Sequence, residues 1–436
     1  MGQAIEKSAA ETLSADAYTT TRRLRGASVL LLLSVVCLSL IAPRAYVAAG
    51  DGRRANGPAE KPQAGWLYVL DSNNGRKTAQ ILVVNPADGS VVRTYPTGMM
   101  PDFALSPDGT RLYVASTRVK GESTHEQPDE LATIDTATGK VLRVVANPDR
   151  ILYIVTPPSS GMALAPNGRW LYVMKYETIT PDNVLYWVET YDTRAGKFLP
   201  EKAEVPLCGW GRLIASDKER QVQVVCTDTK DVRLLKITPR GSAVGAKARL
   251  TRKDVTAAEL AALQPAAAGL VNDAASMLAR ERAKKLIDES ASHEVTAGLS
   301  VAPSESLVLM KNGQLFKVNE SNAAFTNTAV SLPEGKLIHS AAAPSPGRLL
   351  LGLSVPFYKG PWLATEIVAV NPNGSAERSA QTSRGFHYLS VSRDGQTLYA
   401  VNSTSSELML IDAATLSETR VLGGLGVTPS LIIEAP

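Results

Sequence analysis

Few side chains in this sequence have the type and spacing that catalysis or metal binding requires. The four histidines do not stand at metal-ligand spacing to one another; they are His125, His293, His339 and His387. The sequence has no C-x-x-C-H haem-attachment motif, no H-E-x-x-H motif, no phosphate-binding glycine loop and no G-x-S-x-G motif. We therefore expect no catalytic, cofactor-binding or metal-binding residues in this chain.

One acidic segment, residues 125–130, reads His-Glu-Gln-Pro-Asp-Glu and offers carboxylates to a cation. It lacks the number of oxygen ligands that a dedicated calcium loop provides. A solvated loop between two strands is therefore the better interpretation.

The side chains named above must be held in place by the elements of the fold, and the sequence shows a repeated pattern of turns and strands. A turn of the Pro-Asp-Gly type is followed at once by a short apolar strand at residues 106–114, 165–173 and 392–400. Proline presets φ for the first corner, Asp or Asn hydrogen-bonds its own backbone, and glycine accepts positive φ. Each copy therefore predicts a β-hairpin, and the strand that follows ends in a second, acidic turn, as at residues 134–140.

Two hairpins make a unit of four strands, and about seven units follow one another along the chain. The predicted units are residues 66–95, 103–148, 161–206, 211–250, 298–332, 338–382 and 387–426. This spacing predicts an all-β fold, a seven-bladed β-propeller of four-stranded blades over residues 66–436. The last apolar run, Pro429–Ile433, could pair back into the first blade and remove the exposed sheet edges.

Two features of the sequence stand apart from the strand pattern. His387 begins the first strand of the seventh predicted blade, where a propeller faces its central channel or upper surface, and we interpret it as structural. Residues about 253–290 are rich in Ala, Leu, Arg and Lys and begin with a capping box at Thr256–Glu259. They predict a short helical insertion between blades four and five, either packed on the rim or docking another protein.

The amino-terminal segment has the order of a secretory signal. Three arginines precede the apolar run Val29–Ala42, and small residues follow as far as Gly50. This order predicts a signal peptide over residues 1–49, cleaved near Ala49, and hence a periplasmic protein without stable membrane insertion. The run is shorter than the roughly 20 residues that span a bilayer, although an uncleaved anchor stays open as an alternative. Residues 50–65 are polar and rich in Gly and Pro, which predicts a flexible lead-in.

Two cysteines, Cys208 and Cys226, remain after removal of the predicted signal. An even number of cysteines in an oxidising compartment favours a disulfide between them. Both lie beside neighbouring predicted strands, which could bring their Cα atoms within the roughly 4.4–6.8 Å that a disulfide tolerates. Two buried free thiols are the alternative.

Several segments of the body resemble the heavy chain of the methylamine and aromatic amine dehydrogenases. They are residues 98–117, 126–135, 205–208, 225–228 and 422–429. The two cysteine-bearing segments are similar to the blade-four disulfide of that family. The likeness covers most of the body and excludes the insertion at about 253–290.

This resemblance implies the large, non-catalytic subunit of a periplasmic enzyme, built as a propeller of the YVTN type. In that family a small cysteine-rich light chain carries tryptophan tryptophylquinone, oxidises primary amines and passes electrons to a copper protein or a cytochrome. A light chain and a periplasmic electron acceptor are thus the implied partners. Any dehydrogenase activity would belong to the complex.

Three positions depart from the family pattern where the heavy chain meets its substrate channel or partner. Gly75 stands where methylamine dehydrogenase heavy chains place a Phe beside the substrate channel. Met99 and Met100 replace bulkier apolar residues, and methionine adapts to varied neighbours. The resemblance therefore implies that Gly75, Met99 and Met100 face the channel or the partner.

A second function class stays open, a stand-alone exported YVTN-type propeller that binds a ligand or a protein without redox activity. A propeller hydrolase such as a lactonase is less supported, because the repeats show no convergent acid/base cluster. The formal net charge of +4 and the aromatic content of 6% give no basis for expecting a nucleic-acid partner.

Overall fold

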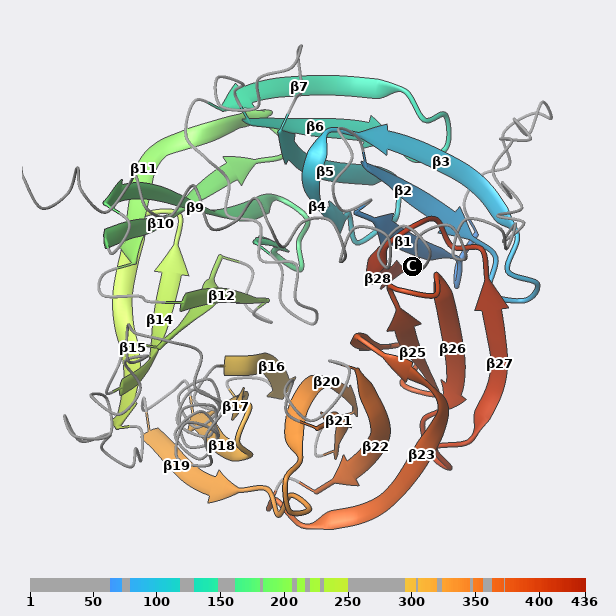
Figure 1. Cartoon of the computed structure of the whole chain (residues 1–436). Coiled ribbons are helices and arrows are strands. Elements are labelled where there is room, and N and C mark those ends of the chain that lie inside the picture. Colours follow the sequence, from blue (N-terminus) through green and yellow to red (C-terminus); the bar gives the residue numbers. More distant parts are fainter. Residues whose placement is uncertain are drawn as a thin grey trace, which may run out of the picture. The chain divides into compact units, whose positions relative to one another are not determined.

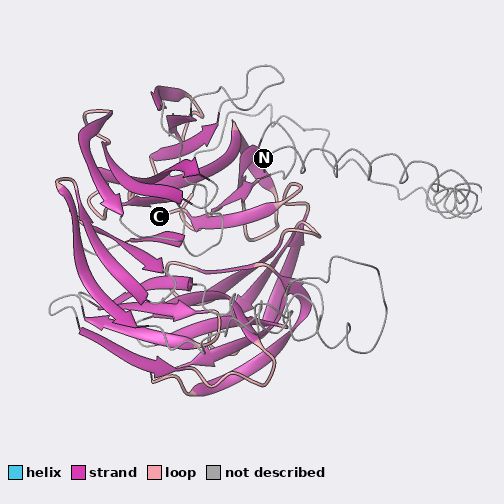
Figure 2. Ribbon diagram, turned by 60° about the vertical axis from the view of Figure 1, so that its left-hand side comes forward, coloured by secondary structure: helices cyan, strands magenta, loops and turns pink. Residues whose placement is uncertain are grey.

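A computed structural model shows how the repeats are arranged. It describes residues 63–72, 79–117, 129–147, 161–180, 183–205, 210–215, 220–227, 231–249, 295–302, 305–319, 324–345, 348–355, 363–371 and 373–436. These residues belong to one unit, Ala55–Pro436. Their regular structure consists of strands, without helices (Figure 2).

In the part of the chain that the structure describes, the strands form seven four-stranded antiparallel sheets (Figure 1). From its innermost strand outward, the first sheet contains β28 (Pro429–Glu434), β1 (Leu67–Asp71), β2 (Ala79–Val84) and β3 (Val91–Thr97). The second contains β4 (Met99–Leu105), β5 (Arg111–Thr117), β6 (Asp129–Asp135) and β7 (Val141–Asn147). The third contains β8 (Met162–Leu164), β9 (Trp170–Thr180), β10 (Asn183–Asp192) and β11 (Lys197–Val205).

The remaining four sheets have the same order of strands. The fourth contains β12 (Trp210–Ala215), β13 (Val222–Thr227), β14 (Asp231–Thr238) and β15 (Gly241–Arg249). The fifth contains β16 (Val295–Ala302), β17 (Glu305–Met310), β18 (Gln314–Asn319) and β19 (Ala324–Ala329). The sixth contains β20 (Leu337–Ser345), β21 (Arg348–Ser354), β22 (Ala364–Val370) and β23 (Ala376–Phe386). The seventh contains β24 (Tyr388–Val391), β25 (Thr397–Asn402), β26 (Glu407–Asp412) and β27 (Glu418–Gly423).

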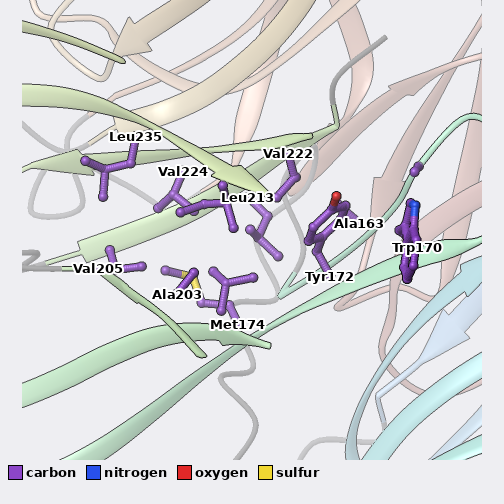
Figure 3. Packing of buried hydrophobic residues seen from close by; sticks show 13 residues of the cluster. Ala163, Trp170, Tyr172, Met174, Ala203, Val205, Leu213, Val222, Val224 and Leu235 are labelled. Carbon is purple, nitrogen blue, oxygen red and sulfur yellow. The ribbon is translucent and has the colours of Figure 1, made fainter. Parts of the chain in front are cut away.

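Buried apolar clusters join each sheet to the next along the chain. The described residues form seven such clusters, one for each pair of neighbouring sheets. Figure 3 shows the cluster between the third and fourth sheets, where Met174 and Val205 meet Leu213 and Val224. Another cluster joins Tyr399 and Leu408 of the seventh sheet to residues of the first. The sheets therefore form a closed ring, which identifies the fold as a β-propeller.

Burial along the strands follows from this stacking. Strand β1 is buried at all five positions, because both faces of its sheet pack on neighbouring sheets. Strand β23, at the outer edge of the sixth sheet, is mostly exposed. The core is thus spread over the seven interfaces between the described sheets, which explains why the middle strands read as continuous apolar runs.

The predicted turns are confirmed by the backbone. Gly109, Gly168 and Gly395 follow the Asp or Asn of their turns and have φ of 68°, 68° and 73°. Asp108 Oδ1 accepts a hydrogen bond from Thr110 N at 3.1 Å, and Asp394 Oδ1 accepts one from Gln396 N at 2.9 Å. The local chemistry of these turns therefore sets the hairpins, as expected from the sequence.

The carboxyl-terminal strand completes the first sheet. β28 pairs with β1, with Leu67 opposite Glu434 and Val69 opposite Ile432, so the predicted return of Pro429–Ile433 to the first blade is confirmed. Asp71, which is fully buried, accepts hydrogen bonds from Val427 N at 3.1 Å and Thr428 N at 2.8 Å.

Gly426 makes this junction possible. Its φ is +86°, and a Cβ atom there would lie 2.3 Å from the Asp71 carboxylate. Glycine is therefore required both by its left-handed backbone and by the close approach of Asp71.

The predicted helical insertion needs a correction. The fold class is corrected to all-β over the described residues, because they contain no helix and do not support the insertion; residues 253–290 lie outside them. The basis for predicting the insertion was local, namely helix propensity and a capping box. Such signals are a weak guide because most helical stability in proteins comes from tertiary packing.

Other predictions for the termini also fall outside the described residues. Residues 1–62 are among those not described, so the signal peptide, its cleavage near Ala49 and the flexible lead-in up to residue 62 stay predictions. Within the described ranges, we find no helix with the length and hydropathy needed to cross a bilayer.

Replacement of Asp71 by alanine tests the closure of the ring. The change leaves the backbone N–H groups of Val427 and Thr428 without their acceptor, and we expect the free energy of unfolding to fall by about 1–3 kcal/mol. Urea denaturation followed by circular dichroism measures this loss. Asp88→Ala, in an exposed turn, is the control and should cost less than about 1 kcal/mol. Equal losses in the two variants would contradict the role given to Asp71.

Candidate functional site

Two histidines far apart in the sequence come together at the inner edge of the ring. His339 lies on β20 and His387 immediately precedes β24, and these are the innermost strands of the sixth and seventh sheets. Their ring centroids are 6.3 Å apart, and the ring planes make an angle of 56°. Both side chains are half-buried. We call these two residues the histidine pair.

The backbone around His387 holds its imidazole in one orientation. His387 N donates to Val401 O at 2.7 Å, and His387 Nδ1 accepts a hydrogen bond from Ser403 N at 3.1 Å. The preceding Phe386 is fully buried between the sixth and seventh sheets. Because Nδ1 acts as an acceptor, the neutral ring of His387 carries its proton on Nε2.

His339 is placed by an irregularity in its strand. Ile338 lies opposite Leu353 and Ser340 lies opposite Gly352, so two steps along β20 correspond to one step along β21. His339 is therefore the extra residue of a β-bulge, a feature that redirects side chains at sheet edges and near binding sites. A hydrogen bond from Ile338 N to Lys311 O, at 2.9 Å, brings the β17–β18 turn of the fifth sheet beside this bulge.

Burial lowers the pKa of both histidines, so the histidine pair is mostly neutral near pH 7. Burial, followed by the charges of His387 and Lys311, lowers the pKa of His339 to about 4, against a hydrogen bond to the His387 backbone. Burial also lowers the pKa of His387. An imidazole whose pKa lies below its ordinary value is mostly neutral at pH 7, and a neutral imidazole can both donate and accept a hydrogen bond.

Asp102 is a second titratable group with an unusual environment. It is 2% exposed, and its oxygens accept hydrogen bonds from Phe103 N and Gly161 N, both at 2.7 Å. Burial raises the pKa of Asp102 to about 7, although the hydrogen bonds from the backbone act in the opposite direction. Asp102 thus connects β4 to the residue before β8, and we assign it a structural role between the second and third sheets.

The third sheet contains a buried ion pair with aromatic neighbours. Lys175, which is fully buried, binds Glu189, and Glu189 also accepts a hydrogen bond from Trp187 Nε1 at 3.0 Å. Lys202 Nζ lies 3.3 Å from the same carboxylate. The ring of Phe198 lies 4.5 Å from Lys175 Nζ. Each charge has a partner, so this group is explained by packing within the sheet.

The structure places only some of the residues that the resemblance singled out. Met99 begins β4 at the inner edge of the ring and is half-buried, and Met100 follows it on the same strand. Gly75 lies outside the described residues. Met99 and Met100 therefore lie on an innermost strand. That Gly75 faces the channel or the partner stays a prediction.

The predicted disulfide also stays a prediction. Cys226 lies on β13 opposite Gly211, and Cys208 lies outside the described residues. Most of the acidic segment 125–130 and His293 are likewise outside them. Within the ranges that the structure describes, no group of three or more His, Cys, Asp or Glu side chains could hold a metal ion.

Sequence reasoning interpreted His387 as structural and did not single out His339. The sequence signal for the pair was weak, because His339 and His387 lie in different repeats and in unlike local sequences, Leu-Ile-His-Ser and Gly-Phe-His-Tyr. Each nevertheless lies where an innermost strand begins. Superposition of the predicted repeats on their first strands would have shown two histidines in corresponding places.

Comparison with known proteins supports the fold and goes no further. No family model matches the sequence, and no curated protein matches it. Among solved structures, the chain is similar to a functionally unknown protein from Desulfotomaculum acetoxidans DSM 771, with 11% identity and a TM-score of 0.51 over 85% of this chain and 99% of that chain. It is also similar to Kuenenia stuttgartiensis hydrazine synthase, with 13% identity and a TM-score of 0.50 over 83% of this chain and 99% of that chain.

A third solved structure, the dihydro-heme d1 dehydrogenase NirN in complex with DHE, is 12% identical with a TM-score of 0.48. The match covers 86% of this chain and 76% of that chain. Identities this low show a shared fold alone. The resemblance to amine dehydrogenase heavy chains is not confirmed by these comparisons and stays a prediction.

Asp102→Asn tests the titration of the buried carboxyl. The folded state, with a pKa of about 7, holds a proton that the unfolded chain releases near pH 4. The contribution of Asp102 to stability is therefore present below pH 4 and is lost as the pH rises to 7. The wild type should lose at least about 1 kcal/mol more than Asp102→Asn between pH 5 and pH 8, measured by urea denaturation. Asp88→Asn should keep the wild-type slope, and parallel curves for Asp102→Asn and the wild type would disprove the assignment.

His339→Gln tests the histidine pair by the opposite dependence on pH. The unfolded chain gains a proton near pH 6.5, whereas folded His339 gains it only near pH 4. Stability from this group is therefore present above pH 6.5 and is lost as the pH falls to 4. We expect His339→Gln to reduce the loss of stability between pH 6.5 and pH 4.5 by about 1–2 kcal/mol. His125→Gln provides the control, and an unchanged acid slope in His339→Gln would show that His339 titrates normally.

Proposed function

We propose that this chain is the heavy subunit of a periplasmic, tryptophan tryptophylquinone-dependent amine dehydrogenase. In this role the propeller is a rigid scaffold that binds a small cysteine-rich light chain. The light chain carries the quinone and oxidises primary amines, and electrons pass from it to a copper protein or a cytochrome. The chain itself supplies binding surface and orientation.

The proposal is supported by one observation. The segments that resemble amine dehydrogenase heavy chains lie at the inner edge of the ring and at its closure. Residues 98–117 form β4 and β5, the two inner strands of the second sheet, and residues 422–429 form the passage from β27 to the closing strand β28. Segments that resemble the heavy chain thus occupy the inner edge and the closure of the propeller. Met99, half-buried at the start of β4, is a residue through which such a surface would meet a partner.

The proposal is tested by isolating the chain with its natural companions. We expect a tagged copy, expressed from its own locus and purified from the periplasm, to retain a small cysteine-rich chain in about equal amount. Mass spectrometry identifies that chain, and a quinone absorbance that bleaches on addition of a primary amine reports its cofactor. Recovery of a monomer without chromophore would refute the proposal and favour the stand-alone binding propeller.

A pair of variants tests which face of the ring holds the light chain. Met99→Arg places a charge on the innermost strand β4, and we expect retention of the light chain to fall at least about fivefold, since an unpaired charge in an interface opposes binding. Val421→Arg places the same charge on the exposed outer strand β27, where Val421 is 37% exposed, and should leave retention unchanged. Melting curves confirm that both variants are folded. Loss of the light chain from Val421→Arg alone would place the partner on the rim.

A further inference from the structure

The sequence contains five Asn-Gly pairs, and three of them lie in turns between strands of the described sheets. These three are residues 167–168, 312–313 and 373–374. The other two, residues 56–57 and 74–75, lie outside the described residues. Because glycine has no Cβ, its backbone nitrogen is open to a close approach by the amide group of the preceding asparagine.

The three turns hold the asparagine side chain in the same way. The side-chain oxygen, Oδ1, accepts a hydrogen bond from the backbone N–H two residues further on, which is Arg169 N at 2.9 Å, Gln314 N at 3.0 Å or Ser375 N at 3.0 Å. Each of these bonds closes a small ring that contains the glycine nitrogen, so it keeps the asparagine amide beside that nitrogen. The three glycine N–H groups donate within their own turns, at 2.8 Å, 3.0 Å and 2.9 Å, so this contact does not distinguish the turns.

The turn at Asn373 differs because its Oδ1 accepts a second hydrogen bond. Ser375 Oγ donates to Asn373 Oδ1 at 2.7 Å. The hydroxyl is oriented for this, because Oγ itself accepts a hydrogen bond from Asn371 Nδ2 at 3.2 Å. In the other two turns the corresponding residues are Arg169 and Gln314, which have no hydroxyl group.

Two donors at one amide oxygen stabilise negative charge on it. Attack of a nucleophile on the amide carbon of Asn373, Cγ, moves an electron pair onto Oδ1. Donors at about 2.7–3.1 Å from such an oxygen lower the barrier to its formation, and both Ser375 donors lie in this range. Asn373 is exposed, so water has access to the same group.

We propose that Asn373 is a site of spontaneous deamidation in the folded protein and that Ser375 promotes the reaction. Gly374 N gives up its proton and bonds to Asn373 Cγ, the Cγ–Nδ2 bond breaks, and Nδ2 leaves with a proton as ammonia. The product is a cyclic succinimide, which water then opens. Addition of water at Cγ gives an aspartate at position 373. Addition at the main-chain carbonyl carbon gives isoaspartate, in which the main chain runs through Cβ and Cγ.

The two products have different effects on the contact between the fifth and sixth sheets. The first sheet already has an aspartate in a similar turn, where Asp88 Oδ1 accepts hydrogen bonds from Ser90 N at 2.9 Å and Ser90 Oγ at 2.7 Å. An aspartate at position 373 therefore keeps the turn. Isoaspartate adds a methylene carbon to the main chain just before Gly374, where a Cβ would lie 2.3 Å from Ala329 O on β19. This product therefore displaces the turn from the fifth sheet.

Peptide mapping by mass spectrometry measures the reaction separately at each pair. The purified full chain is incubated at pH 8, and the conversion of amide to carboxyl is followed at Asn167, Asn312 and Asn373. In the folded protein we expect Asn373 to react at least about threefold faster than the other two. In guanidinium chloride the turns are lost and only the local sequence acts, so we expect this advantage to disappear.

A variant and a matched control test the role of the hydroxyl group. Ser375→Ala removes the Oγ donor and keeps the backbone N–H, so the rate at Asn373 in the folded protein should fall at least about threefold. Its rate in guanidinium chloride should equal that of the wild type. Ser90→Ala makes the same change in the similar turn of the first sheet and should leave the rate at Asn373 unchanged. Melting curves show that both variants are folded.

The comparison of folded and denatured wild type needs no variant, so the test stands even where Ser375→Ala does not fold. Equal rates at the three pairs in the folded protein, or an unchanged rate at Asn373 in Ser375→Ala, would overturn the proposal. The same preference for Asn373 in the folded and the denatured chain would assign it to the local sequence and also overturn the proposal. The reaction needs only this chain and water, so its outcome is independent of whether a light chain binds.

Discussion

The structure depends on the stacking of sheets face to face around a ring. Each sheet has two apolar faces, and neither face is covered until a neighbouring sheet packs on it. A linear row of such sheets would leave two faces and a strand edge open to water, with the cost and the aggregation hazard that this brings. Closure through the cluster that contains Val69 and Tyr399 removes both open faces at once.

The strand that completes this closure is the last one in the chain. β28 supplies the innermost strand of the first sheet, so residues separated by almost the whole sequence become neighbours. Asp71 and Gly426 make the junction specific, since the carboxylate accepts the two N–H groups that precede β28 and only glycine leaves room for it. Hydrophobic stacking of the sheets supplies most of the stability. The directional hydrogen bonds of Asp71 select one arrangement of the stacked sheets.

Buried polar groups have the same selective role elsewhere in the ring. Asp102 connects the second sheet to the third through Gly161 N, and the Lys175–Glu189 pair lies within the third sheet. His339 and His387 also come from different sheets, the sixth and the seventh, and their rings meet at the inner edge of the ring of sheets.

The sequence by itself determined the local features of this protein. The Asp and Gly residues of the turns, the apolar strands between them and the return of Pro429–Ile433 could all be read from it, because each depends on neighbours along the chain or on a simple pairing rule. The helical insertion was predicted from local signals, and the structure does not support it, because the described residues contain no helix and the insertion lies outside them. Only the tertiary structure brought His339 beside His387 and Asp102 beside Gly161, because these contacts arise where different repeats meet. The stacking of sheets sets such distances, and no spacing within one repeat encodes them.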